Sequence, residues 1–275
     1  MSTFTHVGDP LDATEWQSLL LTAKSVGDST VARRIIETTD PLGAGIQTVP
    51  SETLVGITEG YNSILRSNEQ PIRVGDRSSG IVPLIFKDFV VHWRDLAESR
   101  IMNQRLSTSK VAAAASSCAR AEDKFVLFGH EPLGYRGLMT VDGRNIFTGL
   151  QWSNPGDAFN NFSRITEFLS DRGYNGPYAA VVHPHIYAGL HRVLKGSSLL
   201  EIAHVRALLR AGIFRSALLA PRSGLVLSRG KQNAELVVSV ETSVAFLGSR
   251  RMNLPFRVLK AIYLRVHRSD SICTF

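Results

Sequence analysis

Apolar side chains recur every three or four positions in two stretches of the first half of the chain, which is the spacing of one helix face. Asp12 followed three residues later by Glu15 is a capping-box pattern, so we predict a first helix over residues 13–25. A longer helix should begin after Ser107, whose hydroxyl can cap it. Its apolar stripe would consist of Val111, Ala114, Cys118, Ala121, Phe125 and Phe128.

Strands are predicted where apolar residues alternate along the chain or occupy both faces. The segment 84–93 has apolar groups on both faces and should be a well-buried strand. The turn-forming residues 229–233 should join two further strands. Lys260 is the exception in the apolar alternation of the last strand. The further strands are predicted over 178–183, 213–220, 224–228, 235–240 and 256–266.

Helices and strands alternate between residues 135 and 220. Helices are predicted over 156–172, from Pro184 onward and over 198–210, and a glycine after the first and the last supplies a left-handed stop. By contrast, residues 51–80 are rich in Ser, Gly, Asn and Asp and are too numerous for an ordinary connection. We expect this segment to be either disordered or ordered by a neighbouring chain.

Length and composition are those of a globular protein. A chain of 275 residues with 44% hydrophobic content can bury a core in one large or two modest domains. No apolar stretch approaches the roughly 18 residues of a membrane helix, and we expect a cytoplasmic protein. The two cysteines, Cys118 and Cys273, do not indicate a disulfide framework, and Cys118 should be a buried thiol.

Basic residues concentrate toward the end of the chain. Residues 201–275 hold 12 Lys and Arg against 4 Asp and Glu, whereas the first hundred residues hold 9 against 13. Such residues dominate nucleic-acid binding by neutralising phosphates, so a nucleic-acid partner is one interpretation. The basic residues stand singly along strands, however, and not in a run. We favour a basic region that faces the acidic first hundred residues of a neighbouring subunit.

Two histidines are the candidate metal ligands. His183 and His185 lie two positions apart at a strand end, but a zinc site needs three or four convergent ligands and no third is evident. Loop histidines that are hydrogen-bonded or solvated are the simpler interpretation. The sequence contains no Gly-x-Ser-x-Gly nucleophile elbow, no phosphate loop and no Gly-x-Gly-x-x-Gly. A metal-dependent enzyme that uses the two histidines stays as an alternative.

An order of motifs runs along almost the whole chain. An Ala-rich helix ends in Arg-Ala-Glu-Asp-Lys-Phe-Val-Leu-Phe-Gly-His at 120–130, Gly-Tyr-Arg-Gly-Leu follows at 134–138, and Gly-Tyr-Asn-Gly-Pro-Tyr occurs at 173–178. Thr-Glu-Trp-Gln at 14–17 and the double-arginine segment 31–43 precede them. This order resembles that of encapsulin shell proteins, which are compartment proteins built on the HK97-type fold of phage major capsid proteins.

The resemblance implies an α+β HK97-like capsid fold in three parts. A peripheral domain with an N-terminal helix and a spine helix would comprise residues 1–50, 81–134 and 221–275. An extended loop over 51–80 would lie on the adjacent subunit, and an axial α/β domain would span 135–220. The chain would then be a shell protomer without catalytic residues. On the order of 60 copies, or a larger multiple, would form an icosahedral homo-oligomer around a ferritin-like or peroxidase-type enzyme.

The resemblance also implies a cargo site on the inner surface of the shell for the terminal targeting peptide of the enclosed protein. An apolar groove would take aliphatic side chains, and an arginine with a carboxylate would fix the direction of the peptide. Core packing is the competing interpretation for Trp16 and Ile36. By position, the site residues would be Trp16, Leu19, Leu20, Arg33, Ile36, Glu37, Val244 and Phe246.

Two smaller sites follow from the same resemblance. Lys195, Gly196 and Ser197 would line a pore at a five-fold axis, where a ring of lysines favours anions. Some encapsulins hold a flavin against a tryptophan in the equivalent strand region, which is Trp93 here, although core packing is the simpler interpretation of a strand tryptophan. We expect no other cofactor and no metal.

The extended loop bears on covalent locking. Some phage relatives join a loop lysine to a neighbour's asparagine, but no lysine occurs between Lys24 and Lys87. We therefore expect a non-covalent shell. A prophage capsid protein that packages DNA remains a second alternative, suggested by the basic end of the chain.

Overall fold

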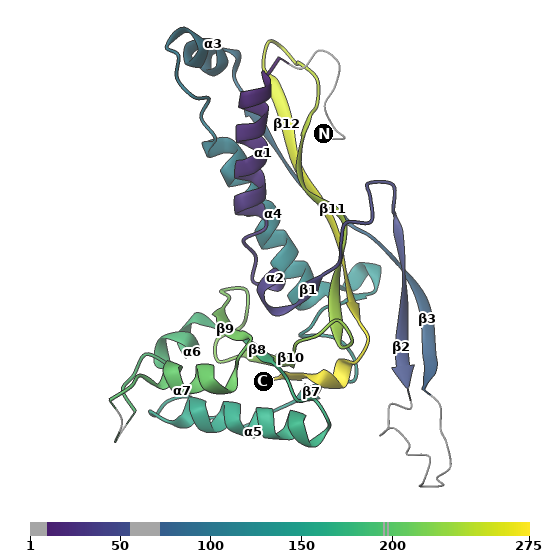
Figure 1. The fold of residues 1–275 in the computed structure, drawn as a ribbon, viewed down its shortest axis with the longest axis vertical. Helices are drawn as coiled ribbons and strands as arrows, with labels where there is room; N and C mark the ends of the chain where they lie inside the picture. Colours follow the sequence, from purple (N-terminus) through teal and green to yellow (C-terminus); the bar gives the residue numbers. More distant parts are fainter. Residues whose placement is uncertain (1–9, 56–71, 195, 197) are drawn as a thin grey trace.

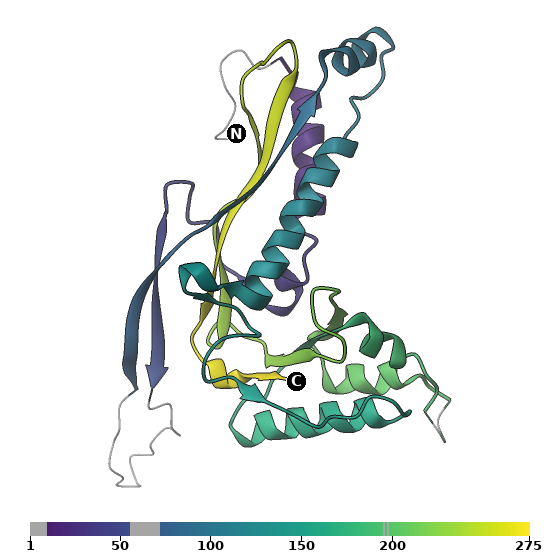
Figure 2. The same ribbon diagram turned by 180° about the vertical axis from the view of Figure 1, so that it is seen from behind.

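The computed structural model describes residues 10–55, 72–194, 196 and 198–275. In Figure 1 these residues form an upright body of long strands and helices, a second body of shorter elements at its foot, and a two-stranded arm at one side. Figure 2 shows the same three parts from behind, with the arm projecting away from the helices. The outline is elongated, so a large share of the molecule lies at its surface.

The upright body is a sheet with helices on one face. α1 (Ala13–Gly27) and α4 (Ser109–Phe128) lie side by side on that face, and α3 (Trp93–Ile101) lies at the far tip (Figure 1). β11 pairs antiparallel with β12, and β12 pairs antiparallel with β4. Among the described residues, the strand order is β1 (Glu37–Thr38), β11 (Ala234–Phe246), β12 (Leu254–Val266) and β4 (Leu84–Val91).

The first helix begins as predicted. The Asp12 carboxylate accepts a hydrogen bond from the Glu15 amide at 2.8 Å, and the Glu15 carboxylate accepts one from the Asp12 amide at 2.9 Å. The helix continues two residues beyond the predicted end, to Gly27. A Cβ on Gly27 would lie 2.7 Å from Thr242 Cγ2, so a small residue is required where α1 crosses β11.

α4 differs from its prediction at the start and along its stripe. Its N-cap is Thr108 and not Ser107. The Ser107 hydroxyl lies 3.1 Å from the Ser109 hydroxyl, and its distance to the Ser109 amide is longer, at 3.5 Å. Ala121 is exposed, since a step of four residues from Cys118 continues the inward face to Glu122. The buried face of this helix therefore includes a carboxylate.

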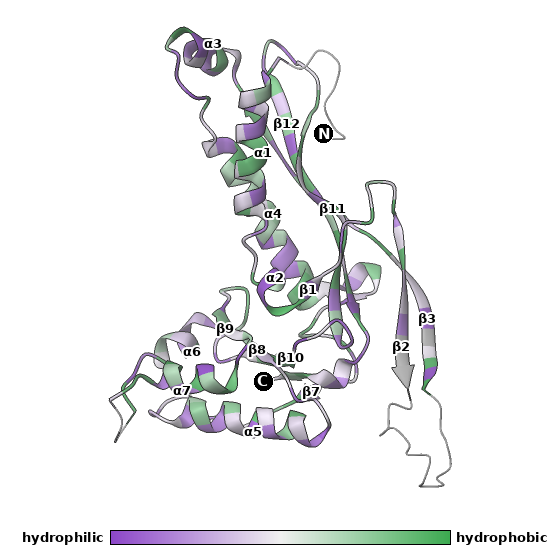
Figure 3. Cartoon of the chain, in the orientation of Figure 1, coloured by the Kyte–Doolittle hydropathy of each residue, from purple (hydrophilic) through white to green (hydrophobic). Residues whose placement is uncertain are grey.

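The second body is a five-stranded sheet flanked by α5 (Asp157–Asp171), α6 (Pro184–Gly189) and α7 (Glu201–Leu208). Hydrophobic and hydrophilic residues alternate around α5 in Figure 3, as expected of a helix with one buried face. In the described residues, the strand order is β7 (Asn145–Ile146), β13 (Ile272–Thr274), β10 (Gly224–Ser228), β8 (Tyr178–Val182) and β9 (Gly212–Arg215).

This sheet combines strands from distant parts of the chain. β10 and β13 come from residues 221–275, which the family resemblance assigned to the other domain, and β10 lies between β13 and β8. Residues 229–233 join β10 to β11, as predicted, and β11 belongs to the other sheet. The reason is burial, because every residue of β10 is buried and the strand needs a neighbour on each side.

The arm consists of β2 (Thr48–Val55) and β3 (Arg73–Ile81), paired antiparallel. The extended loop predicted over 51–80 thus has strands at both ends, and its residues 56–71 lie outside the described ranges. A Cβ on Gly80 would lie 2.2 Å from the Tyr263 ring, so the base of the arm is packed tightly on β12. The remaining short elements are α2 (Ala32–Ile35), β5 (Gly129–His130), η1 (Glu131–Leu133), β6 (Tyr135–Arg136) and η2 (Ser269–Ser271).

β4 is not the well-buried strand that its sequence predicts. Phe89 and Val91 are buried, but Leu84, Phe86 and Val90 are 51%, 49% and 38% exposed. β4 is an edge strand, and helices cover only one face of its sheet. An apolar pattern on both faces requires a second covering layer, which the described part of this chain does not provide.

Within the described ranges, every helix is too short or too polar to cross a membrane.

Candidate functional surfaces

A cluster of charged groups is buried at the centre of the upright body. Lys260 of β12 forms an ion pair with Glu122 of α4, and both side chains are fully buried. The Lys260 ammonium also donates to the Gly27 carbonyl at 2.6 Å. Arg33 Nε and Thr30 Oγ1 both donate to Glu122 Oε1, at 2.9 and 3.1 Å, while Lys260 binds Glu122 Oε2. The buried carboxylate is thus paired and hydrogen-bonded, as a buried charge must be.

The next residue of α4 holds the same segment. The Asp123 carboxylate accepts hydrogen bonds from the Ala32 amide at 2.8 Å and the Val31 amide at 3.2 Å. Burial raises the pKa of this carboxyl above its ordinary value, although the two amides act in the opposite direction. Two consecutive carboxylates therefore fasten the connection between α1 and β1 to the spine helix.

The sequence contained a partial signal for this cluster. Glu122 lies at a helical spacing from Cys118, and Lys260 interrupts the apolar alternation of its strand. A charge at each of two core-facing positions suggests a buried pair. Their separation of 138 residues hides the pairing until the fold is known.

The eight positions expected at a cargo site fall into two groups. Leu19, Ile36, Val244 and Phe246 are at most 3% exposed and belong to the core. Trp16 is partly buried, with its ring 5.6 Å from the Phe256 ring, and Leu20 is partly buried on the same helix. The neighbouring Leu21, which the sequence analysis did not select, is 59% exposed. Accessible apolar surface at these positions is therefore concentrated on α1.

The two charged residues of the expected cargo site, Arg33 and Glu37, do not form an ion pair with each other. Arg33 binds Glu122 and lies 3.5 Å from Asp28, whereas Glu37 lies 3.9 Å from Arg229. The chain becomes extended at Ile36, directly after the short helix α2, so that Arg33 and Glu37 enter different surroundings. Each charge already has a partner within the chain.

Several basic residues near the end of the chain are likewise paired internally. Arg257 forms two hydrogen bonds with Asp88, at 2.6 and 2.9 Å, and Arg265 binds Glu235 at 2.6 Å. The sequence pattern favoured acidic groups of a neighbouring subunit as the partners of this region. Asp88, which belongs to the acidic first hundred residues, instead pairs with Arg257 of its own chain.

A hydrogen bond from a backbone amide to a side chain joins the two candidate metal ligands. His183 is the N-cap of α6, and its Nδ1 accepts a hydrogen bond from the His185 amide at 3.1 Å. In the part of the chain that the structure describes, no three His, Cys, Asp or Glu residues are grouped as metal ligands. The pair therefore has the geometry of a helix cap.

The expected pore residues fall between α6 and α7 in the sequence. Lys195 and Ser197 fall outside the described residues, while Gly196 has a φ of +83°, which favours glycine. Val193 and Leu200 pair across the loop and are 59% and 39% exposed. Exposed apolar residues therefore lie on both sides of Gly196 in the sequence.

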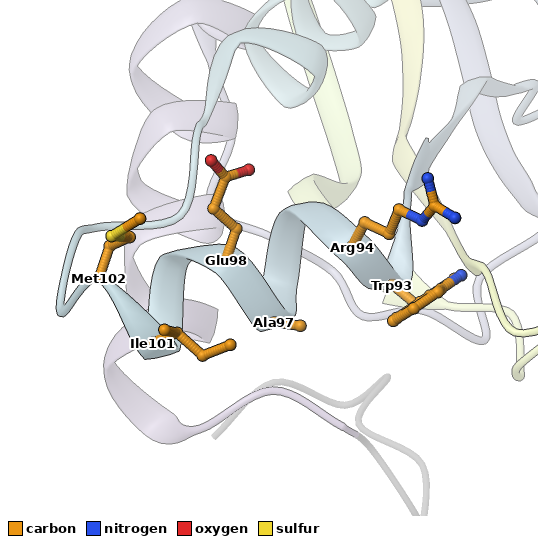
Figure 4. A pocket seen from close by; sticks show the side chains of 6 residues that line it. All are labelled: Trp93, Arg94, Ala97, Glu98, Ile101 and Met102. Carbon is orange, nitrogen blue, oxygen red and sulfur yellow. The ribbon is translucent and has the colours of Figure 1, made fainter.

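Trp93 is not in a strand but is the first residue of α3, and it is 43% exposed. The Arg94 guanidinium lies 5.5 Å from the centre of its ring. Figure 4 shows the side chains of α3 that line a shallow hollow of about 370 Å³, and all of them come from this helix and its end. A flavin site needs enclosing walls and polar groups directed at the ring, which one helix does not supply. The hollow does not fit a flavin in a single chain.

The architecture is that of the HK97-like capsid fold, which defines the class of protein. A virus-like particle from Pyrococcus furiosus matches with a TM-score of 0.72 at 16% identity, over 94% of this chain and 98% of the other. The capsid of Myoviridae phage XM1 matches with a TM-score of 0.62 at 14% identity, over 89% and 90%. At these identities the similarity establishes the fold.

Sequence comparison establishes the family. The model of the family described as encapsulating protein for peroxidase (Linocin_M18) matches residues 1–262, and the chain belongs to this family of encapsulin shell proteins. The type 1 encapsulin shell protein EncA of Myxococcus xanthus is 41% identical, over 98% of this chain and 94% of that protein. A diheme-cytochrome-encapsulin shell fusion protein of Kuenenia stuttgartiensis is 34% identical, over 89% and 67%.

Family membership confirms the resemblance inferred from the order of motifs. The chain is a structural shell protein and not an enzyme, which sets aside the alternative of a metal-dependent enzyme at His183 and His185. Encapsulin shells are homo-oligomers that enclose cargo, and this protein forms such a nanocompartment.

Proposed function

We propose that the compartment is icosahedral, with about 60 copies of this chain or a larger multiple, and that it encloses a ferritin-like or peroxidase-type enzyme. The observation that carries the proposal is exposed apolar surface on several separate parts of the chain. β4 exposes Phe86, α3 exposes Ile101 and β7 exposes Ile146, at 49%, 81% and 63%. An isolated soluble protein seldom exposes large apolar patches. A closed shell requires contacts in several directions, and these surfaces supply them.

Negative-stain electron microscopy of the purified protein tests the assembly. We expect uniform hollow particles, and image averaging should reveal five-fold axes. Small scattered particles at all salt concentrations and pH values would overturn the proposal. Nuclease-resistant nucleic acid inside the particles would instead favour the prophage capsid alternative.

The cargo peptide binds along α1 in this proposal. Trp16 and Leu20 line one side of the helix, Leu21 is exposed beside them, and Arg33 lies beyond the other end of the helix. About 11 residues separate Trp16 from Gly27, which is roughly 16 Å of helix. About five residues of an extended peptide would cover that length. Apolar peptide side chains would contact the leucines, while the buried residues Leu19, Val244 and Phe246 belong to the core cluster on which α1 packs and Ile36 belongs to another.

A reporter assay tests the cargo site. The probe is a fluorescent protein that ends in the carboxy-terminal segment of a ferritin-like or peroxidase-type protein from the same genome. Leu21→Asp should reduce the fluorescence that copurifies with particles by about tenfold or more, because a charge in an apolar groove is poorly solvated. Thr148→Asp, at an exposed position outside α1, is the matched control. Equal loading of both variants would contradict the site.

The loop 195–197 lines the opening through which small molecules enter, and the compartment lies in the cytoplasm. The first part is supported by the φ of +83° at Gly196, which lies in the connection between α6 and α7. The second is supported by Cys118 and Cys273, both of which are free thiols. Lys195→Glu should slow the entry of an anionic quencher into fluorescent cargo, compared with a neutral quencher of similar size.

A further inference from the structure

Within the described residues, the chain passes between the upright body and the second body through three connections. Residues 137–144 link β6 to β7, residues 229–233 link β10 to β11, and residues 267–271 link β12 to β13. In Figure 1 the lower ends of β11 and β12 meet the second body. We call these three connections the joint, because any change in the angle between the two bodies must occur there.

Asn233 ties two connections of the joint together. Its side-chain amide donates a hydrogen bond to the Ser228 carbonyl, at the end of β10, at 2.9 Å. Its own carbonyl accepts hydrogen bonds from the His267 and Arg268 amides, at 2.9 and 3.1 Å. Asn233 and Ser228 are each only 3% exposed, so water does not replace these bonds if they break. One buried residue therefore joins the chain that leaves the second body to the chain that returns to it.

The turn that carries Asn233 is itself held in place. The Gly230 carbonyl accepts hydrogen bonds from the Asn233 and Ala234 amides, at 2.9 and 3.1 Å. Gly230 has a φ of +152°, which a residue with a side chain rarely adopts. The Arg229 amide donates to the Pro177 carbonyl of the second body at 2.9 Å. Asn233 therefore occupies a defined position relative to the second body.

Asn145 ties the remaining connection to the same place. Its side-chain amide donates to the Asp270 carbonyl at 2.7 Å and to the Ile272 carbonyl at 3.3 Å. The Arg268 guanidinium lies 4.3 Å from the centre of the ring of Tyr174, a buried residue of the second body. Two asparagine side chains thus link all three connections of the joint in series.

Packing between the bodies does not by itself select an angle. Leu227 of β10 and Leu236 of β11 belong to one apolar cluster, so the core is continuous across the joint. The hydrophobic effect favours burial of this surface but has no preferred direction. Hydrogen bonds weaken steeply when their geometry is distorted. The buried amides of the joint therefore supply the directional restraint that the apolar contact lacks.

We propose that Asn233 and Asn145 are positioning residues that fix the angle between the two bodies, and that this fixed angle limits the shell to one size. Relative motion is the normal expectation for two bodies of one chain unless their interface prevents it. Subunits with one shape close with one curvature, whereas subunits with a variable angle can close into shells of different diameters. The proposal rests on assembly into a shell and adds the residues that determine its size.

Spin labels on the two bodies test the angle directly. Ser116→Cys on α4 and Glu167→Cys on α5 place one exposed label on a helix of each body, and both native thiols are buried. Pulsed electron paramagnetic resonance of unassembled protomers gives the distribution of distances between the labels. We expect a single narrow distribution in the otherwise unchanged chain. Asn233→Ala should broaden it at least about twofold, because a hinge is released.

Particle diameters in negative-stain images test the second part of the proposal. The unchanged chain should give one diameter, and Asn233→Ala and Asn145→Ala should each give more than one. Asn233→Asp keeps the size of the side chain but sets a carboxylate against the Ser228 carbonyl, so it should act like Asn233→Ala. Asn160→Ala, at an exposed position of α5, is the matched control and should leave the label distances and the diameter unchanged.

A broad distance distribution in the chain without joint substitutions would overturn the proposal, as would equal widths with and without Asn233→Ala. Broadened distances with an unchanged single diameter would overturn the link between the joint and shell size. Far-ultraviolet circular dichroism shows whether each variant folds, and Asn145→Ala provides the same test if Asn233→Ala does not. Absence of particles from the parent protein would contradict the proposed shell, while the distances in protomers would still decide whether the angle is fixed.

Discussion

Lys260 and Glu122 form an ion pair in which neither side chain is exposed to solvent. The same carboxylate binds Arg33 and Thr30, so strand β12, helix α4 and the connection after α1 meet on one group. Burial of the pair costs desolvation free energy. Removal of one member leaves the other charge buried without a partner, which strongly destabilises the fold.

Replacement of the two members should have unequal effects. Glu122→Leu leaves both Lys260 and Arg33 without their carboxylate, and we expect the free energy of unfolding to fall by about 3–5 kcal/mol. Lys260→Met leaves Glu122 bound to Arg33 and Thr30, so a smaller loss of about 1.5–3 kcal/mol is expected. Urea unfolding of unassembled protomers measures both. An equal loss in the two variants would contradict the central role of the carboxylate.

Asp123 should make stability depend on pH with an unusual sign. Burial raises the pKa of its carboxyl above 3.8, so the folded chain binds this proton more tightly than the unfolded chain does. The contribution to stability is therefore complete below the ordinary pKa and is lost as the pH rises through the raised value. Asp123→Asn does not titrate, and its unfolding free energy relative to the parent should increase as the pH rises from 4 through this window.

Urea midpoints measured across that range check the prediction. Thr148→Ala, at an exposed position without a titratable group, is the control, and its pH profile should follow that of the parent. A relative stability of Asp123→Asn that decreases with rising pH would mean that the two backbone amides outweigh burial.

The thiols should be unreactive in the folded protein. Burial raises the pKa of Cys273 to about 12 and raises the pKa of Cys118 as well. At pH 8 about one Cys273 side chain in ten thousand would be a thiolate, which is the reactive form. Ellman's reagent should therefore detect neither thiol in native particles and both in urea. Rapid modification of native particles would show that one of these sites opens.

The shell should dissociate completely in boiling detergent. No lysine occurs between Lys24 and Lys87, so the extended loop has no amine for an isopeptide bond. Electrophoresis after boiling should show a single band at 30.2 kDa. A ladder of multiples that survives reducing conditions would require a covalent bond from another part of the chain.

Local patterns predicted local structure well. The capping box at Asp12 and Glu15 involves four successive residues, so the sequence alone determines it. The amphipathic α5 likewise formed within one residue of its predicted bounds. The family resemblance then supplied the fold, because its motifs occur in order over most of the chain.

Features that depend on distant partners were not predictable in the same way. The apolar pattern of β4 does not reveal whether the covering layer belongs to the same chain, and Phe86 is half exposed here. Position within the family placed Ile36 near a cargo site, but burial depends on Val238 and other core residues far along the chain. The sequence likewise does not show that the two strands joined by residues 229–233 belong to different sheets, because β10 pairs with β8 and β13.

The interior place of β13 has a consequence for the order in which the chain folds. Residues 272–274 lie between β7 and β10, so the second sheet is incomplete until a segment made after both long strands has been synthesised. Such non-local pairing is slow, because distant segments lose chain entropy when they meet, before their contacts stabilise the fold. A partly synthesised chain therefore lacks a complete second sheet. Association between incomplete subunits on the same messenger RNA is expected to be restrained until β13 has been synthesised.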